Sequence, residues 1–145
     1  MARDSTDGEI EAGRRLRAAG LRPTRQRIAL AALLLDGRCR HVTAEDVRAE
    51  ARAADIAVSL ATVYNALNQF TAAGLLREVT VEPGRSYFDT NVSEHHHFLI
   101  ESSGTLVDVA AGALRIDGMP ELPPGTALHR VDVVIRVRPK GAPGA

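Results

Sequence analysis

The sequence predicts an α+β protein, with helices in its amino-terminal part and short strands in its carboxy-terminal part. Between residues 24 and 74, apolar residues recur at helical spacing behind capping residues. From residue 76 onward, alternating and β-branched segments are typical of strands. The chain of 145 residues has room for one ordinary domain or two small ones. We expect a first domain over residues 1–88 and a second over 89–145, which ends in a disordered tail from residue 139.

The first two predicted helices begin behind threonines. Thr24 is placed to cap a helix whose apolar residues lie within 28–35 and which ends before Gly37. Thr43 and Asp46 form a variant capping box for the second helix. Its inward-facing residues are expected to be Val47, Ala51 and Ala54.

The third predicted helix has one apolar and one uncharged polar face. Ser59 caps it, and Gly74 follows its end near Ala73. The apolar stripe consists of Leu60, Val63, Leu67 and Phe70. The opposite face consists of Ala61, Thr62, Tyr64, Asn65, Asn68 and Gln69. A solvated face is usually rich in Lys and Glu, whereas Asn and Gln can bond adenine at two atoms. We therefore expect this face to read base edges, with packing on another subunit as the alternative.

A β-hairpin is predicted next. Residues 76–81 alternate in polarity, Pro83 and Gly84 favour a type II turn, and a second strand covers residues 86–88. Three helices followed by a hairpin indicate a winged helix-turn-helix domain, with the third helix in the major groove. Arg85, at the hairpin tip, is placed to reach the DNA backbone or the minor groove.

Charge is segregated along the chain although the formal net charge is +0. Residues 14–40 contain eight arginines and one acid, whereas residues 89–145 contain five basic and seven acidic residues. A basic front is typical of a chain whose amino-terminal part meets phosphate. The arginines expected to contact DNA in this region are Arg14, Arg15, Arg17 and Arg25.

Strands are predicted at residues 96–101, 105–109 and 131–137. A sheet of this size cannot bury both faces by itself. Pairing with a second copy solves this problem, and two-fold symmetry suits a palindromic DNA site. We therefore expect a homodimer that binds double-stranded DNA.

Three consecutive histidines, His95, His96 and His97, precede the apolar end of the first of these strands. In a strand, His95 and His97 share one face and His96 lies on the other. Two imidazoles on one face form half of a metal site, with a polar edge strand as the alternative. His96, together with His129, is a candidate for a second metal site or for axial haem ligation, although a partly exposed strand-end residue is the simpler interpretation of His129.

Several classes of protein are disfavoured by the sequence. No apolar run approaches the roughly 20 residues that span a bilayer, and the polar first residues do not resemble a signal peptide. The lone Cys39 excludes an intramolecular disulfide and a zinc site made of cysteines alone. We expect a cytoplasmic protein that has no membrane partner.

Several motifs in this order resemble the ferric uptake regulator family. They are GLRPTRQR at 20–27, HVTAED at 41–46, SLATVYN at 59–65, YFD at 87–89 and HHHF at 95–98. The resemblance extends from about Ala12 to Arg138. Within the family the chain is most similar to the iron response regulator branch, because of the HHHF run, the LVD segment at 106–108, and Asn65 where most relatives have arginine.

The resemblance implies a regulatory metal site whose matching positions here are His41, Asp89, His95, His97 and Asp108. This mixed set of nitrogen and oxygen ligands suits Fe²⁺, Mn²⁺ or Zn²⁺. The paired cysteines that hold structural zinc in relatives are replaced by Ile100 and Ser103, so that site cannot form. In the iron response regulator branch the histidine run takes part in haem binding, and haem weakens DNA binding.

The resemblance thus implies a metal- or haem-responsive transcriptional regulator of iron homeostasis that binds palindromic, AT-rich DNA as a dimer. A peroxide-sensing repressor of the same family is the first alternative, because its relatives use the same ligand pattern. A small non-haem metalloenzyme is the second, since two histidines and one carboxylate can form an iron triad. The small size and the uncharged helix face argue against an enzyme.

Overall fold

The computed structural model describes residues 2–82 and 84–141, and it divides into two compact units, Met1–Val92 and Ser93–Ala145. The division falls after Val92 rather than after residue 88, because Asp89 is the last residue of a strand in the first unit. Helices and two small sheets confirm the α+β class. Of the expected disordered tail, residues 142–145 lie outside the described residues.

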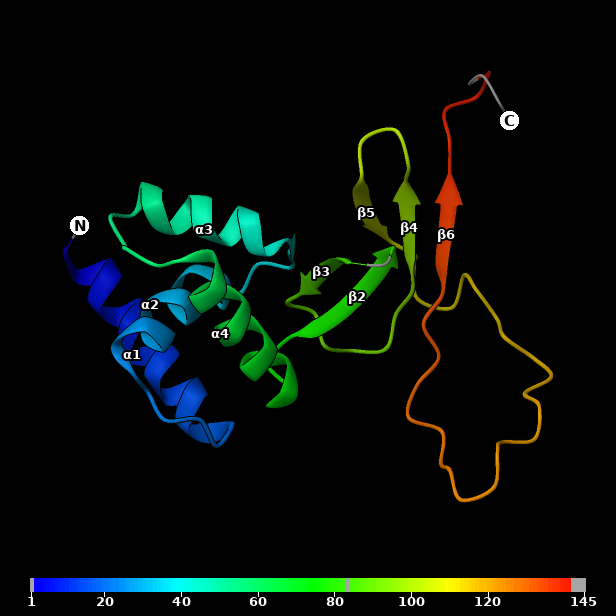
Figure 1. Cartoon of the computed structure of the whole chain (residues 1–145), viewed down its shortest axis with the longest axis horizontal. Helices are drawn as coiled ribbons and strands as arrows, with labels where there is room; N and C mark the ends of the chain where they lie inside the picture. The colour runs from blue at the N-terminus through cyan, green and yellow to red at the C-terminus, as the bar shows by residue number, and fades with distance from the viewer. Residues whose placement is uncertain (1, 83, 142–145) are drawn as a thin grey trace. The chain divides into compact units, whose positions relative to one another are not determined.

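Four helices lie in the first unit (Figure 1): α1 Ala2–Ala18, α2 Arg25–Leu34, α3 Ala44–Ala53 and α4 Leu60–Ala72. The helix α1 was not predicted. The aliphatic core of the unit includes Leu16, Leu30, Leu34, Val47, Val63, Leu67 and Phe70. Phe70 and Phe88 are the aromatic residues of this core cluster, so close packing of mostly aliphatic side chains stabilises the unit. Within the described residues, no helix combines the length and apolarity that crossing a bilayer requires.

The predicted helix starts are confirmed by their caps. Thr24 Oγ1 accepts a hydrogen bond from the backbone of Arg27, and the side chains of Thr43 and Asp46 form a reciprocal capping box. Ala54 does not face inward as expected. It is exposed, because α3 ends at Ala53 and the chain turns there through Asp55, which has φ 59°.

The sheet of the first unit contains β1 His41–Val42, β2 Arg77–Glu82 and β3 Arg85–Asp89, in the order β1-β3-β2. Neighbouring strands are antiparallel, and β2 and β3 form the predicted hairpin. Pro83 lies outside the described residues, whereas Gly84 has φ 76°, a conformation that favours glycine. The two-residue strand β1 was not predicted, and it places His41 opposite Asp89.

The second unit contains β4 His97–Ile100, β5 Thr105–Asp108 and β6 Val134–Val137, in the order β5-β4-β6 (Figure 1). β4 is antiparallel to β5 and parallel to β6. β6 is shorter than predicted, because its ladder starts where β4 starts, at His97 opposite Val134. His129 therefore lies in the loop between β5 and β6 rather than at the start of a strand, which corrects the expectation.

Candidate functional site

In the first unit, a histidine and an acid lie close together on neighbouring strands. His41 and Asp89 are partners in the β1–β3 ladder, and His41 Nε2 lies 3.2 Å from Asp89 Oδ2. Asp89 is fully buried at 0% exposure, and its Oδ1 accepts a hydrogen bond from the backbone of Asn91 at 2.9 Å. A buried carboxylate is costly unless it is paired or binds a cation. This pair is therefore suited to contribute one nitrogen and one oxygen to a metal ion.

In the second unit, two histidines converge on one carboxylate. His97 and Asp108 are partners in the β4–β5 ladder. The Nε2 atoms of His95 and His97 lie 3.4 and 3.5 Å from the same Asp108 oxygen, Oδ1. The two imidazole centroids are 4.5 Å apart, which confirms that His95 and His97 lie on one side of the chain.

His95 stands between two hydrogen-bond acceptors. Its Nδ1 lies 2.7 Å from the carbonyl oxygen of Ser93, and a carbonyl can only accept. Nδ1 therefore carries a proton, and in a neutral ring Nε2 then presents a lone pair. That lone pair would face the Asp108 carboxylate, another acceptor. The arrangement is favourable only when a cation, either a proton or a metal ion, lies on the Nε2 side.

His96 and His129 are placed differently. His96 Nδ1 accepts a hydrogen bond from the backbone N–H of Val133 at 3.2 Å, so its ring proton lies on Nε2 when the ring is neutral. His129 is exposed in the loop before β6. Neither residue belongs to a group of three or more metal-ligand side chains in the described part of the chain. A second metal or haem site that includes these residues stays a prediction.

The predicted two faces of α4 are largely present. Val63, Leu67 and Phe70 are buried, whereas Leu60 is only half-buried. On the polar face Thr62 is half-buried, and its hydroxyl contacts that of Ser59 at 2.9 Å. The exposed members of the polar face are Ala61, Tyr64, Asn65, Asn68 and Gln69. This face is therefore not covered by other parts of its own unit.

Tyr64 is linked to the neighbouring helix. Its hydroxyl donates a hydrogen bond to Glu45 Oε1 at 3.3 Å. Partial desolvation of the hydroxyl, together with the negative charge of Glu45, raises the pKa of Tyr64 above its ordinary value. Tyr64 thus stays a neutral hydroxyl at physiological pH, which suits contact with DNA.

Gln69 has a contact that the sequence did not predict. Arg27, which lies 42 residues earlier, donates to its Oε1 from Nε at 3.1 Å and from Nη2 at 2.9 Å. No local sequence pattern signals a contact between side chains on two helices so far apart in the chain.

The arginines expected to contact DNA differ in their surroundings. Arg14 forms an ion pair with Glu11, whose pKa is lowered mainly by the hydrogen bond from Arg14. Arg15 Nη1 donates to the carbonyl oxygen of Leu35 at 3.3 Å, whereas Arg17 and Arg25 are exposed. Their predicted phosphate contacts remain predictions.

Arg85 opens β3 at the hairpin tip, as expected. Its guanidinium carbon lies 5.7 Å from the centroid of the Tyr87 ring, and Nη2 donates to the Tyr87 hydroxyl at 3.1 Å. The side chain is nevertheless exposed. The contact with Tyr87 holds the Arg85 side chain along β3, next to the hairpin turn, and leaves it accessible to solvent.

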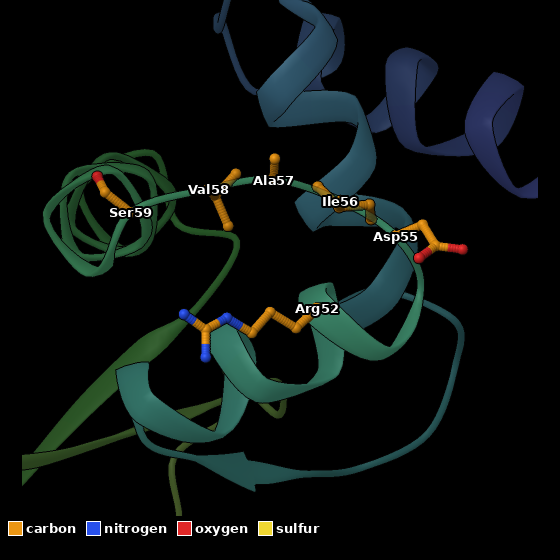
Figure 2. Close-up of a pocket in the computed structure, with 6 residues that line it drawn as sticks. All are labelled: Arg52, Asp55, Ile56, Ala57, Val58 and Ser59. Carbon is orange, nitrogen blue, oxygen red and sulfur yellow. The ribbon is translucent and has the colours of Figure 1, made fainter.

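A shallow hollow of about 590 Å³ lies beside the start of α4 (Figure 2). It follows the turn from α3 to α4, and its polar lining residues are Arg52, Asp55 and Ser59. Arg52 adds positive charge close to backbone N–H groups at a helix start, which also attract anions. Because Asp55 carries the opposite charge, the side chains that line the hollow have no net charge, and Arg52 is its one basic group.

Known proteins resemble the chain over most of its length. The sequence model of the Ferric uptake regulator family matches residues 18–116. The peroxide-responsive repressor PerR of Staphylococcus epidermidis is 35% identical over 106 residues, which cover 72% of this chain and 70% of that protein. The ferric uptake regulation protein of Legionella pneumophila is 38% identical over 91 residues, or 63% of this chain and 67% of that protein.

Solved structures of family members also resemble this chain over most of its length. The ferric uptake regulator from Pseudomonas aeruginosa with manganese superimposes with a TM-score of 0.66 at 27% identity, and the match covers 89% of this chain and 98% of that one. The predicted fold class, a winged helix-turn-helix domain followed by a small α/β domain, is thereby confirmed. Membership of the iron response regulator branch stays a prediction. The chain belongs to the ferric uptake regulator family.

Proposed function

We propose that this chain is a metal-responsive transcriptional regulator of iron homeostasis whose affinity for DNA depends on one bound divalent ion. The observation that carries the proposal is the convergence of the His95 and His97 imidazoles on one oxygen of Asp108, which brings two nitrogen ligands and one oxygen ligand together. The nitrogen and carboxylate ligands suit Fe²⁺, Mn²⁺ or Zn²⁺ better than Cu⁺. Relatives named as metal uptake regulators and a family structure that contains manganese support this choice.

The proposed ligands are His41, Asp89, His95, His97 and Asp108. Only residues 90–94 separate Asp89 from His95, and an extended chain of that length reaches about 20 Å. The two ligand sets can therefore share one ion without rearranging either unit. An ion held by both sets would link the units and restrict how a dimer presents its two α4 helices to DNA.

The polar face of α4, together with the amino-terminal arginines, is the proposed DNA-binding surface, and a palindromic, AT-rich duplex is the proposed partner. A homodimer is supported by exposed large apolar residues between β5 and β6, since exposed apolar surface often marks a protein–protein contact. These residues are Ile116, Met119, Leu122 and Leu128. Two-fold symmetry would match the two halves of the duplex.

In this proposal the ion is an effector and not a catalytic centre, because the relatives are named as regulators. Two finer interpretations use the same residues. Peroxide sensing is favoured by the similarity to a peroxide-responsive repressor and by the two carboxylates in the ligand set. Haem sensing is favoured by the run of three histidines alone.

The experiment measures binding of the full chain to a labelled palindromic, AT-rich duplex by fluorescence anisotropy, with Mn²⁺ and with chelator. The expected result is metal-dependent binding that weakens linearly in log–log form as salt rises. One histidine from each ligand set is then replaced, in the variants His41→Ala and His97→Ala. In each variant the effect of Mn²⁺ on duplex binding should disappear, and the chain should no longer bind one ion. Asp117→Asn, an exposed acid outside both sets, is the matched control.

Failure to bind any duplex at moderate salt, with or without metal, would contradict the regulator. Two ions per chain, each lost with a different histidine, would contradict the shared site. A visible absorption titration with haem, repeated on the chain without His95, His96 and His97, decides the haem interpretation. An increase of one oxygen mass on His41 or His95 after Fe²⁺ and peroxide treatment would support peroxide sensing, applying to imidazole the logic of oxidation at sulfur.

A further inference from the structure

We propose that Arg27 is a positioning residue that fixes the amide of Gln69, so that α4 presents only hydrogen-bond donors to DNA at that position. The inference rests on the proposed function, because it concerns how α4 reads a duplex. It assigns Arg27 a role in base preference in addition to any attraction that its charge exerts on phosphate.

The contacts of Arg27 use every nitrogen of its guanidinium. Nε and Nη2 donate to Gln69 Oε1 at 3.1 and 2.9 Å, and Nη1 donates to the carbonyl oxygen of Arg22 at 2.9 Å. The planar group is thereby held from two sides, by the loop before α2 and by the side chain on α4. A guanidinium held in this way is a rigid fork with little freedom to release the amide.

The same contacts determine which way the Gln69 amide points. Arginine has donors only, so the amide atom that faces Arg27 must be the oxygen and not the nitrogen. The amide N–H groups of Gln69 are therefore directed away from the guanidinium. The next residue, Phe70, is fully buried, which fixes the backbone from which the Gln69 side chain extends.

Gln69 lies on the same side of α4 as Asn65, one helical turn later, and both are exposed. A free glutamine in the major groove bonds adenine at two atoms, because it offers an acceptor and a donor together. The Gln69 oxygen already accepts two hydrogen bonds, so its donors remain for the groove. Donors suit base atoms that accept, such as guanine O6 and N7 or thymine O4. This contact thus modifies the expectation that the amides of this face favour adenine.

The test uses the full chain loaded with Mn²⁺ and a set of duplexes that each change one base pair of the half-site. Gln69→Glu keeps an oxygen for Arg27 and replaces the donor by an acceptor. Its preference at one base pair should move by about tenfold towards cytosine or adenine, which offer donors. Its resistance to urea should equal or exceed that of the unmodified chain, because the contact with Arg27 becomes an ion pair.

Arg27→Lys keeps the charge but loses the fork, so the amide can rotate. We expect its preference at the same base pair to shift towards adenine. Gln26→Glu makes the same charge change as Gln69→Glu on an exposed neighbour in α2. This control should weaken binding to all duplexes by the same factor and leave base preferences unchanged.

The inference would be overturned if Gln69→Glu weakened binding to all duplexes by the same factor, as the control does. The contact would then only join α2 to α4. If Arg27→Lys does not fold, the result with Gln69→Glu decides alone. An unmodified chain that binds no duplex would overturn the proposed function together with this inference. Metal-dependent binding with unchanged base preferences in both variants overturns the inference only.

Discussion

His41 and Asp89 face each other across the β1–β3 ladder, and the His41 Nε2 atom lies 3.2 Å from an oxygen of a carboxylate that has no exposed surface. A short strand thus holds an imidazole against a buried acid. The pair is the half of the proposed metal site that belongs to the winged-helix unit. Its effect on metal affinity can be measured separately from the histidine run.

Asp89→Asn keeps the size of the side chain and removes its charge. We expect affinity for Mn²⁺ to fall at least tenfold, because changes even in the residues that support metal ligands have effects of about 10- to 100-fold. The stabilisation of the folded chain by Mn²⁺ should fall as the affinity falls. For the unmodified chain it is about 2.7 kcal/mol when Mn²⁺ is present at 100 times its Kd. Thermal unfolding over a range of Mn²⁺ concentrations measures both.

Asp117→Asn removes one exposed acid in the loop between β5 and β6 and serves as the control for charge. Equal metal affinity in the two variants would show that Asp89 is a structural partner of His41 and not a ligand. Unfolding in the presence of chelator separates the two effects, because there only the loss of the His41 contact remains.

The helix starts could be predicted because their signals are local. Thr43 and Asp46, for example, are three residues apart and cap each other. The strand β1 could not be predicted, since two residues give no periodic pattern and its partner β3 lies far along the chain. His41 was therefore identified only through the family resemblance, whereas His95 and His97 stood out in the sequence itself.

Misjudged elements have similar causes. β6 was predicted to start too early, because β-branched residues indicate strand propensity and not how far the neighbouring strand extends. Ala54 was assigned to the core by periodicity, although the chain leaves the helix one residue earlier. The contact between Arg27 and Gln69 depends on how α2 packs against α4, which no local pattern encodes.

His96 can be tested as a structural residue. Its Nδ1 accepts the backbone N–H of Val133, the residue before β6. His96→Ala should lower the free energy of unfolding by about 1 kcal/mol and speed hydrogen exchange at Val133, because it removes this acceptor. His96→Asn, whose oxygen can take the place of Nδ1, should restore most of both. If both variants exchange as the unmodified chain does, the contact does not hold the loop to the sheet.

The contribution of Glu101 and its two arginine partners, Arg136 and Arg138, to stability should depend on pH. Glu101 accepts a hydrogen bond from Arg138 at 2.8 Å, and this bond, together with the charges of Arg138 and Arg136, lowers the pKa of Glu101. A carboxyl whose pKa is lower in the folded state contributes stability above its ordinary pKa and loses it as pH falls through the folded value. Glu101→Gln should therefore be less stable than the unmodified chain at neutral pH, with a difference that vanishes in acid.

An NMR titration of the side-chain carboxyl carbons checks this directly. Glu101 should titrate below the ordinary pKa of a glutamate, and the substitution Arg138→Gln should raise its midpoint. A midpoint that is ordinary and unaffected by that change would mean that the arginines do not hold Glu101 in solution. The result bears on the β6 end of the sheet and leaves the proposed metal ligands unaffected.

Ser59 combines two roles that a pair of substitutions can separate. Its hydroxyl caps α4 by accepting from the backbone N–H of Thr62 at 3.1 Å, and the residue lies beside the hollow at the start of α4, which Arg52 and Asp55 also line. Ser59→Ala should lower the free energy of unfolding by about 1 kcal/mol, as the loss of an N-cap typically does. Its effect on binding of DNA by the folded protein should be small.

Ser59→Asp reverses this pattern. Aspartate caps as well as serine does, and its charge also suits the positive end of the helix, so stability in urea should be retained. If the start of α4 approaches the DNA backbone, the new charge repels phosphate, and duplex affinity should fall most strongly at low salt, where screening is weakest. Affinity equal to that of the unmodified chain at every salt concentration would show that α4 approaches DNA by another part of its surface.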